Sequence, residues 1–189
     1  MKFMIYLVVL FLVLNIMNAN KVAMANSLIQ DSCKKASKFE EPHYYNLCIT
    51  SIKQNPESQK ARNIDELTVI GVKNAISNMT NVKGIVEKIL KERKYKSRLS
   101  EKLLRDCSKL YSEGNDFLTK SLKYINSRNY QEVDNSIAKA GTVPRTCEMG
   151  FNGDNNQTSP VTKDNDVLFE VVTIPRSFNH DAHIVPRIA

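Results

Sequence analysis

The sequence of 189 residues lacks the short motifs that identify most hydrolase and nucleotide-binding active sites. It contains no G-x-S-x-G nucleophile turn, no H-E-x-x-H zinc motif and no glycine-rich phosphate loop. Only three histidines are present, and we interpret His43 as a solvated loop residue rather than a catalytic base. His180 and His183 resemble a loose metal pair, but they lack a third strong ligand nearby. We therefore predict that the chain is not an enzyme and needs no metal or other cofactor.

Long apolar runs are absent except at the N-terminus. After the basic start at Met1-Lys2, the stretch from Phe3 to Met17 is almost wholly apolar, and Ala23-Met24-Ala25 provides the small residues of a signal-peptidase site. A run of about fifteen residues is short for a membrane span, which needs about 20. We interpret residues 1–25 as a secretory signal peptide and expect a mature chain without a membrane anchor. Cleavage after Ala19 and an uncleaved anchor are the alternatives.

The four cysteines lack the spacings typical of metal and redox sites. There is no C-x₂₋₄-C pair for zinc and no C-x-x-C of the thioredoxin type. In a secreted chain, Cys33, Cys48, Cys107 and Cys147 therefore predict two disulfides. Three pairings are open. Pairing Cys33 with Cys48 and Cys107 with Cys147 keeps each bridge within one or two neighbouring elements.

Charge is mixed along most of the chain. Removal of residues 1–25 takes away Lys2 and Lys21, which leaves 25 basic and 20 acidic residues. The one dense basic run is KERKYKSR, residues 91–98, and we interpret it as a solvated connector between two helices. Contact with an anionic wall polymer or a protein partner is the alternative. No nucleic-acid partner is expected on the secretory route.

Strand patterns are nearly absent, whereas apolar residues recur at helical spacing. Asn63-x-x-Glu66 predicts a capping box that opens a long helix, and further helices are predicted over residues 97–126, from 129 onward and over 159–174. Gly141 and Pro144 are expected to bend or interrupt the third of these. The pattern predicts an all-α fold, an antiparallel four-helix bundle over residues 61–174, preceded by a helical hairpin over 26–60. Residues 175–189 show no helical stripe and predict an irregular tail.

Two N-x-T sequons are candidate glycosylation sites. Asn156 lies in a polar loop and is the better acceptor, whereas Asn78 lies in the middle of a predicted helix.

Several segments together resemble the plant invertase/pectin methylesterase inhibitor family over residues 26–174. The resemblance rests on SCKKASKFEEPHYYNLC, LLRDCSKLYSEGNDFL, NYQEVDNSIAKAGTVPRTCEMGF and SPVTKDND. The sequence is most similar to the subgroup named "putative invertase inhibitors". The family resemblance implies a secreted or vacuolar four-helix bundle in which Cys33 pairs with Cys48 and Cys107 with Cys147. It also implies an extracellular inhibitor that blocks the substrate cleft of a pectin methylesterase or an acid invertase.

Three departures from the family bear on function. Some invertase inhibitors use a Pro-Lys-Phe segment before the third bundle helix, where this chain has residues 127–130, SRNY, so that Tyr130 is the only aromatic remaining. We interpret Tyr130 as a helix core residue, with a contact to the partner enzyme as the alternative. Lys139 and Gly141 replace a small residue and a packing leucine, and Pro175 predicts a truncated last helix that leaves part of the bundle uncovered. These changes raise a second hypothesis, a secreted binding or allergen-like protein that has lost inhibitory activity.

Overall fold

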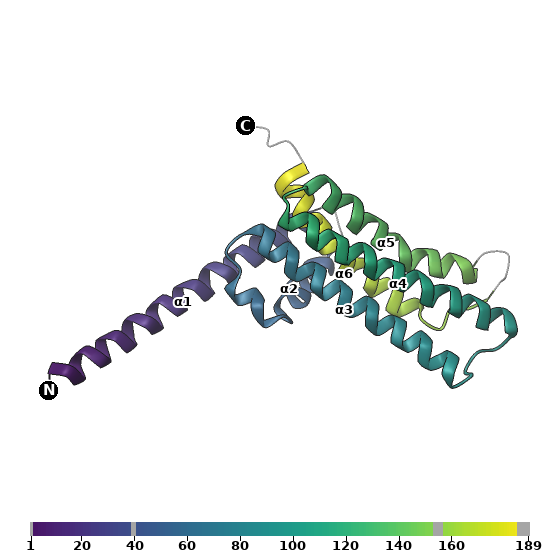
Figure 1. Ribbon diagram of the computed structural model, residues 1–189, viewed down its shortest axis with the longest axis horizontal. Helices are drawn as coiled ribbons and strands as arrows, with labels where there is room; N and C mark the ends of the chain where they lie inside the picture. The colour runs from purple at the N-terminus through teal and green to yellow at the C-terminus, as the bar shows by residue number, and fades with distance from the viewer. Residues whose placement is uncertain (1, 39–40, 153–156, 185–189) are drawn as a thin grey trace.

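The computed structural model describes residues 2–38, 41–152 and 157–184, and these residues are helical with no strand (Figure 1). The elements, in chain order, are α1 (Lys2–Ala36), α2 (Tyr44–Lys53), the 3₁₀ helix η1 (Pro56–Lys60), α3 (Ile64–Lys91), α4 (Arg98–Asn126), α5 (Tyr130–Asn152), α6 (Thr162–Asn179) and the π-helix η2 (His180–Ile184).

Helices α3 to α6 form an antiparallel four-helix bundle. Each of these helices packs against its neighbours in sequence, and α6 closes the ring against α3 (Figure 1). The core of the bundle is a continuous apolar cluster from all four helices, including the fully buried Met79, Tyr111, Leu118, Ile137 and Phe151. The predicted fold, an all-α bundle with an N-terminal hairpin and two disulfides, is confirmed.

Side-chain caps determine where α3 and α4 begin. The Asn63 side chain accepts a hydrogen bond from the Glu66 amide at 2.9 Å, and the Glu66 carboxylate accepts one from the Arg62 amide at 2.8 Å. Ser97 caps α4 in the same way through the Ser100 amide at 3.1 Å. These bonds satisfy amides that would otherwise lack a partner in the first helical turn.

Both α3 and α4 end in a turn that places an arginine in the left-handed region. Arg93 has φ of 53° and Arg128 has φ of 56°. In each turn the following amide reaches back five residues, from Lys94 to the Ile89 carbonyl at 3.0 Å and from Asn129 to the Tyr124 carbonyl at 2.9 Å. This is the Schellman pattern, in which glycine is the usual residue at the left-handed position.

The hairpin formed by the second half of α1, by α2 and by η1 packs on one end of the bundle through a second apolar cluster. Ile29, Tyr44 and Ile52 of the hairpin meet Leu67 at the start of α3 and Phe178 near the end of α6. The hairpin therefore rests on the end of the bundle where α3 begins and α6 ends (Figure 1).

The first half of α1 projects away from the rest of the molecule (Figure 1). Every described side chain from Leu10 to Met24 is exposed, and burial begins at Ala25. Within the part of the chain that the structure describes, no helix combines the length and apolarity needed to cross a membrane.

Neither of the two expected helix interruptions occurs. Helix α5 runs without interruption through Gly141 and Pro144. Helix α6 does not stop at Ile174 but continues through Pro175 to Asn179, and η2 follows to Ile184. Pro175 is buried against α3 at Gly71, where an added Cβ would lie 3.0 Å from the proline Cβ. The proline ring therefore packs closely on a residue that has no side chain. Tertiary packing at this site outweighs the local tendency of proline to end a helix.

Candidate protein-binding surface

The first disulfide joins the two helices of the hairpin. Cys33 of α1 and Cys48 of α2 are bonded at 2.01 Å, and both residues are fully buried. His43, directly before α2, contacts Glu170 of α6 at 2.9 Å, and the Asn74 side chain of α3 donates to the Ser51 carbonyl at 2.6 Å. The hydrogen bond to Glu170, together with its negative charge, raises the pKa of His43. The hairpin is thus closed on itself and attached to the bundle by polar contacts.

The second disulfide joins α4 to α5 inside the bundle. Cys107 and Cys147 are bonded at 2.07 Å beside a buried polar network. The Tyr111 hydroxyl donates to Asn165 Oδ1 at 2.7 Å, and Asn165 Nδ2 donates to Glu148 Oε1 at 2.6 Å. Burial raises the pKa of Tyr111, so its hydroxyl remains a donor. This network connects α4, α5 and α6.

Three side chains from distant parts of the sequence meet at the end of the bundle where α4 turns into α5. We call Asp65, Tyr130 and His183 the Tyr130 cluster. The Tyr130 hydroxyl donates to Asp65 Oδ2 at 3.0 Å, and His183 Nε2 lies 2.7 Å from Asp65 Oδ1. The rings of Tyr130 and His183 stack with centroids 3.5 Å apart and planes 6° apart. Burial, with the neighbouring Asp65 carboxylate, raises the pKa of Tyr130.

The end of α6 and η2 supply further contacts to this region. Arg176 forms two hydrogen bonds to the carboxylate of Asp134 on α5, both 3.2 Å long. Asn179 is buried and donates to the Tyr130 carbonyl at 3.0 Å. The expectation that an irregular tail from residue 175 leaves the bundle uncovered was therefore wrong up to Ile184. Residues 185–189 lie outside the described part of the chain.

The structure places the other predicted site residues as follows. Asn78 is half-buried on α3, and its side chain donates to the Asn74 carbonyl at 2.9 Å. Thr80 of the same sequon is exposed, but its hydroxyl donates to the Ile76 carbonyl at 2.8 Å. Asn156 lies outside the described residues. A glycan on Asn78 would require its side chain to leave the helix surface that it now contacts.

Sequence reasoning did not identify Asp65 or the role of His183. Asp65 lies in the first turn of α3, where an acidic side chain commonly stabilises a helix. His183 was noted only as half of a loose histidine pair, and the structure directs it to Asp65, 118 residues away. Among the described residues, no three His, Cys, Asp or Glu side chains are grouped so that they could hold a metal ion.

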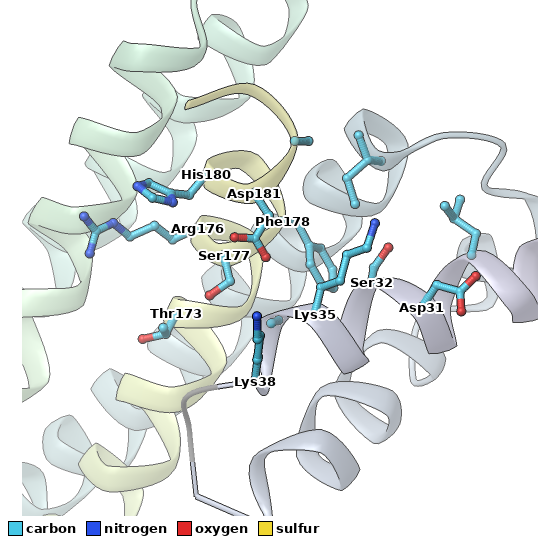
Figure 2. A pocket seen from close by; sticks show the side chains of 14 residues that line it. Asp31, Ser32, Lys35, Lys38, Thr173, Arg176, Ser177, Phe178, His180 and Asp181 are labelled. Atoms are coloured by element: carbon cyan, nitrogen blue, oxygen red, sulfur yellow. The ribbon is translucent and has the colours of Figure 1, made fainter. Parts of the chain in front are cut away.

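An open groove of about 1040 Å³ separates α1 from the α6–η2 segment. Its lining includes the apolar Leu28, Ile64 and Phe178. Figure 2 shows Lys35 and Lys38 on the α1 side, and Ser177 and Asp181 on the other. The groove is open and contains charges of both signs beside apolar side chains, so its features suit contact with a protein surface.

Comparison with known proteins gives a consistent family. The model for plant invertase/pectin methylesterase inhibitors matches residues 27–177. The "Pectinesterase inhibitor 12" of Arabidopsis thaliana is 37% identical over 180 residues, which are 95% of this chain and 99% of that protein. The "Putative invertase inhibitor" of Platanus acerifolia is 25% identical over 160 residues, 85% of this chain and 88% of the relative. The "Cell wall / vacuolar inhibitor of fructosidase 2" of Arabidopsis thaliana is 25% identical over 152 residues, 77% and 78% of the two chains.

Proposed function

This chain belongs to the plant invertase/pectin methylesterase inhibitor family, and from that premise we propose that it is a secreted inhibitor of a plant pectin methylesterase. The family consists of inhibitor proteins, and the relatives are named as inhibitors, so the chain is not an enzyme. What remains a proposal is the target, the mode of blocking and the route of secretion.

The observation that carries the choice of target is the similarity to the pectinesterase inhibitor. That relative is 37% identical over nearly the whole of both chains, whereas the relative named for invertase inhibition is 25% identical over a shorter stretch. An acid invertase is the second candidate target, because relatives named as inhibitors of invertase and of fructosidase also match this chain.

The Tyr130 cluster also weakens the case for the mode of invertase binding that uses this segment. The segment that some invertase inhibitors use reads SRNY here, without Pro-Lys-Phe. Its only aromatic side chain, Tyr130, is bonded to Asp65 and stacked on His183, so that it contributes to the packing of the bundle end. Insertion of this ring into an enzyme would first have to break both contacts.

The proposed mode of action is steric. Two disulfides, a docked hairpin and a bundle closed at the Tyr130 end give a preformed surface, and a rigid partner loses less conformational entropy on binding. A specific protein complex of ordinary stability covers about 800 Å² on each partner, an area that four adjacent helices can provide. We propose that this surface covers the substrate cleft of the enzyme and supplies no reacting group.

The contacts of the altered helices weaken the hypothesis that inhibitory activity has been lost. Lys139 lies on the surface with its ammonium group 5.8 Å from the centre of the Phe117 ring, and an added Cβ on Gly141 would make an ordinary 3.7 Å contact with Val172. Neither replacement interrupts α5. Helices α5 and α6, whose sequences suggested a loss of inhibitory activity, are therefore continuous.

The route of secretion rests on the N-terminal segment. The exposed first half of α1 contributes no described buried side chain before Ala25. Removal of residues 1–25 would leave the hairpin disulfide and every residue of the second apolar cluster in place. This supports delivery to the extracellular space, with the vacuole as the alternative.

A titration tests the proposal. The oxidised mature protein, residues 26–189, is added in increasing amounts to a purified plant pectin methylesterase and, in parallel, to a purified acid invertase. We expect methylesterase activity to fall in proportion to the inhibitor added, and invertase activity to remain.

The other outcomes of the titration would each support one of the two alternative functions. Loss of invertase activity alone would move the target to that enzyme and overturn our choice. A folded protein that leaves both activities unchanged would support the binding or allergen-like function.

A further inference from the structure

The turn between α3 and α4 carries most of the unbalanced charge of the molecule. Within residues 88–98 there are six basic side chains and one acid, Glu92. The basic residues are all exposed, and we call them the basic turn: Lys88, Lys91, Arg93, Lys94, Lys96 and Arg98. Their formal charge, with Glu92 included, is +5, which equals the net charge expected of the whole chain after residues 1–25 are removed.

Ion pairs neutralise little of the charge of the basic turn among the described residues. Arg62, Lys83 and Arg105 each pair with a glutamate four residues away, and Arg176 pairs with Asp134. In the basic turn, Lys94 pairs with Glu92 at 2.7 Å, and the other five have no carboxylate within 4.0 Å among the described residues. Unpaired like charges in one turn repel each other and attract a polyanion.

The basic turn is also held in a fixed shape. The amides of Glu92, Arg93 and Lys94 donate to carbonyls of the last turn of α3, and Ser97 caps the start of α4. Tyr95 lies between the basic residues and packs its ring against the bundle core. The cations are therefore presented from a rigid support and not from a mobile loop.

Arg93 occupies a position that favours glycine. Its φ of 53° is the left-handed conformation, which a residue with a side chain adopts only at a cost. A basic side chain at this position adds to the positive charge of the turn.

The basic turn lies at the end of the bundle opposite the hairpin and the Tyr130 cluster (Figure 1). A ligand bound there would leave the hairpin end and most of the helix faces accessible. This position allows one molecule to hold a polymer at one end while the rest of its surface contacts a protein.

We propose that the basic turn binds an acidic polysaccharide with a carboxylate on its sugar units, a polyuronate. The choice of this polyanion rests on the proposed function, because a pectin methylesterase converts neutral methyl esters of such a polymer into carboxylates. The cations attract the carboxylates of consecutive sugars, and the binding weakens with salt because exposed charges are screened. The inhibitor would then concentrate where its target has already acted.

The experiment measures binding of the oxidised mature protein to polygalacturonate, without any enzyme, by isothermal titration at low and high salt. The test variant is Lys91→Gln, Arg93→Gly and Lys96→Gln, in which glycine also removes the backbone strain at position 93. The matched control neutralises three exposed lysines elsewhere, Lys53→Gln, Lys73→Gln and Lys123→Gln, and so has the same net charge.

We expect the test variant to bind at least about tenfold more weakly than the wild type at low salt, and the control to bind within about twofold of it. Equal loss in the two variants would show that net charge alone is responsible, and unchanged binding of the test variant would show that the turn is not the site. Either result overturns the proposal, as would equal binding to fully methyl-esterified pectin or tighter binding to anionic phospholipid vesicles.

Inhibition of the methylesterase is measured on the same three proteins. A wild type that binds polygalacturonate but inhibits nothing would overturn the proposed function and leave the polymer site standing. A wild type that inhibits the enzyme but does not bind polygalacturonate would overturn the polymer site alone.

Discussion

At the scale of single residues, Tyr130 is held inside the molecule at a position where the sequence left a contact with the partner enzyme as an alternative. Its hydroxyl and its ring are both engaged within the molecule, by Asp65 and His183. The sequence indicated neither contact, since the three residues lie far apart along the chain. We therefore assign Tyr130 to stability.

Replacing Tyr130 by phenylalanine distinguishes a contribution to stability from a contact with the enzyme. Tyr130→Phe keeps the stacked ring but loses a hydrogen bond to a carboxylate, which is worth about 1–2 kcal/mol. We expect a lower midpoint of urea unfolding and an unchanged inhibition constant against the methylesterase. An unchanged midpoint with weaker inhibition would instead make Tyr130 a contact residue.

The His43–Glu170 pair predicts a pH dependence. Because the pKa of His43 is raised above 6.5 in the folded protein, its contribution to stability is fully present below about pH 6.5 and is lost as the pH rises through the raised pKa. We expect wild type and His43→Gln to differ in melting temperature at about pH 5 and to converge at about pH 9.

Glu170→Gln provides the partner control, because it removes the same pair from the other side. It should produce the same convergence as His43→Gln. A difference between wild type and His43→Gln that does not change with pH would show that protonation of His43 does not contribute.

At the scale of the helices, two glycines give opposite predictions. An added Cβ on Gly84 would meet nothing within 4 Å, whereas one on Gly114 would collide with the buried Met79 side chain and lie 3.2 Å from Val143. Gly84→Ala should raise the free energy of unfolding by about 0.5–1 kcal/mol, because alanine loses less entropy in a helix. Gly114→Ala should lower it by about 1–3 kcal/mol through overpacking.

Chemical unfolding of the two alanine variants beside the wild type is the measurement. Stabilisation by both substitutions would mean that α3 and α4 are farther apart at Gly114 than in this structure.

The segment after Ile174 gives a second prediction at this scale. A chain that ends at Ile174 loses the burial of Phe178, the partner of the buried Asp134 and the His183 contact with Asp65. Loss of the phenylalanine and of the partner of one carboxylate should together cost about 3–6 kcal/mol. We expect a much lower melting temperature for this chain than for the milder variant Arg176→Gln. An unchanged melting temperature would restore the view that the segment is an irregular tail.

How far the fold could be predicted from the sequence depended on the range of the interactions involved. Asn63 and Glu66 indicated the start of α3 because a capping box acts within one turn. Pro175 misled because the residue that accommodates it, Gly71, lies a hundred positions earlier on another helix. The Tyr130 cluster could not be predicted for the same reason, since nothing local indicates that His183 reaches Asp65.

At the scale of the whole molecule, the N-terminal segment gives a prediction about processing. We expect the full chain, expressed in a plant secretory system, to yield a mature protein whose first residue is Asn26. Mass spectrometry of the intact secreted protein measures this directly. A product that begins at Asn20 would indicate cleavage after Ala19, and a retained first segment would indicate an anchor.

The division of the molecule into two ends follows from its packing and charge. The hairpin, the end of α6 and the Tyr130 cluster close one end through buried contacts, and the basic turn lies at the other end. A rigid body of this kind suits a function that depends on shape and charge and not on catalysis.

Above all, we propose that this rigid shape inhibits a pectin methylesterase. The most direct measurement is the residual activity of a purified plant methylesterase after one molar equivalent of the mature protein is added, either oxidised or with all four cysteines reduced and alkylated. We expect near-complete loss of activity with the oxidised protein and little loss with the reduced protein. Full activity in the presence of the oxidised, folded protein would contradict it.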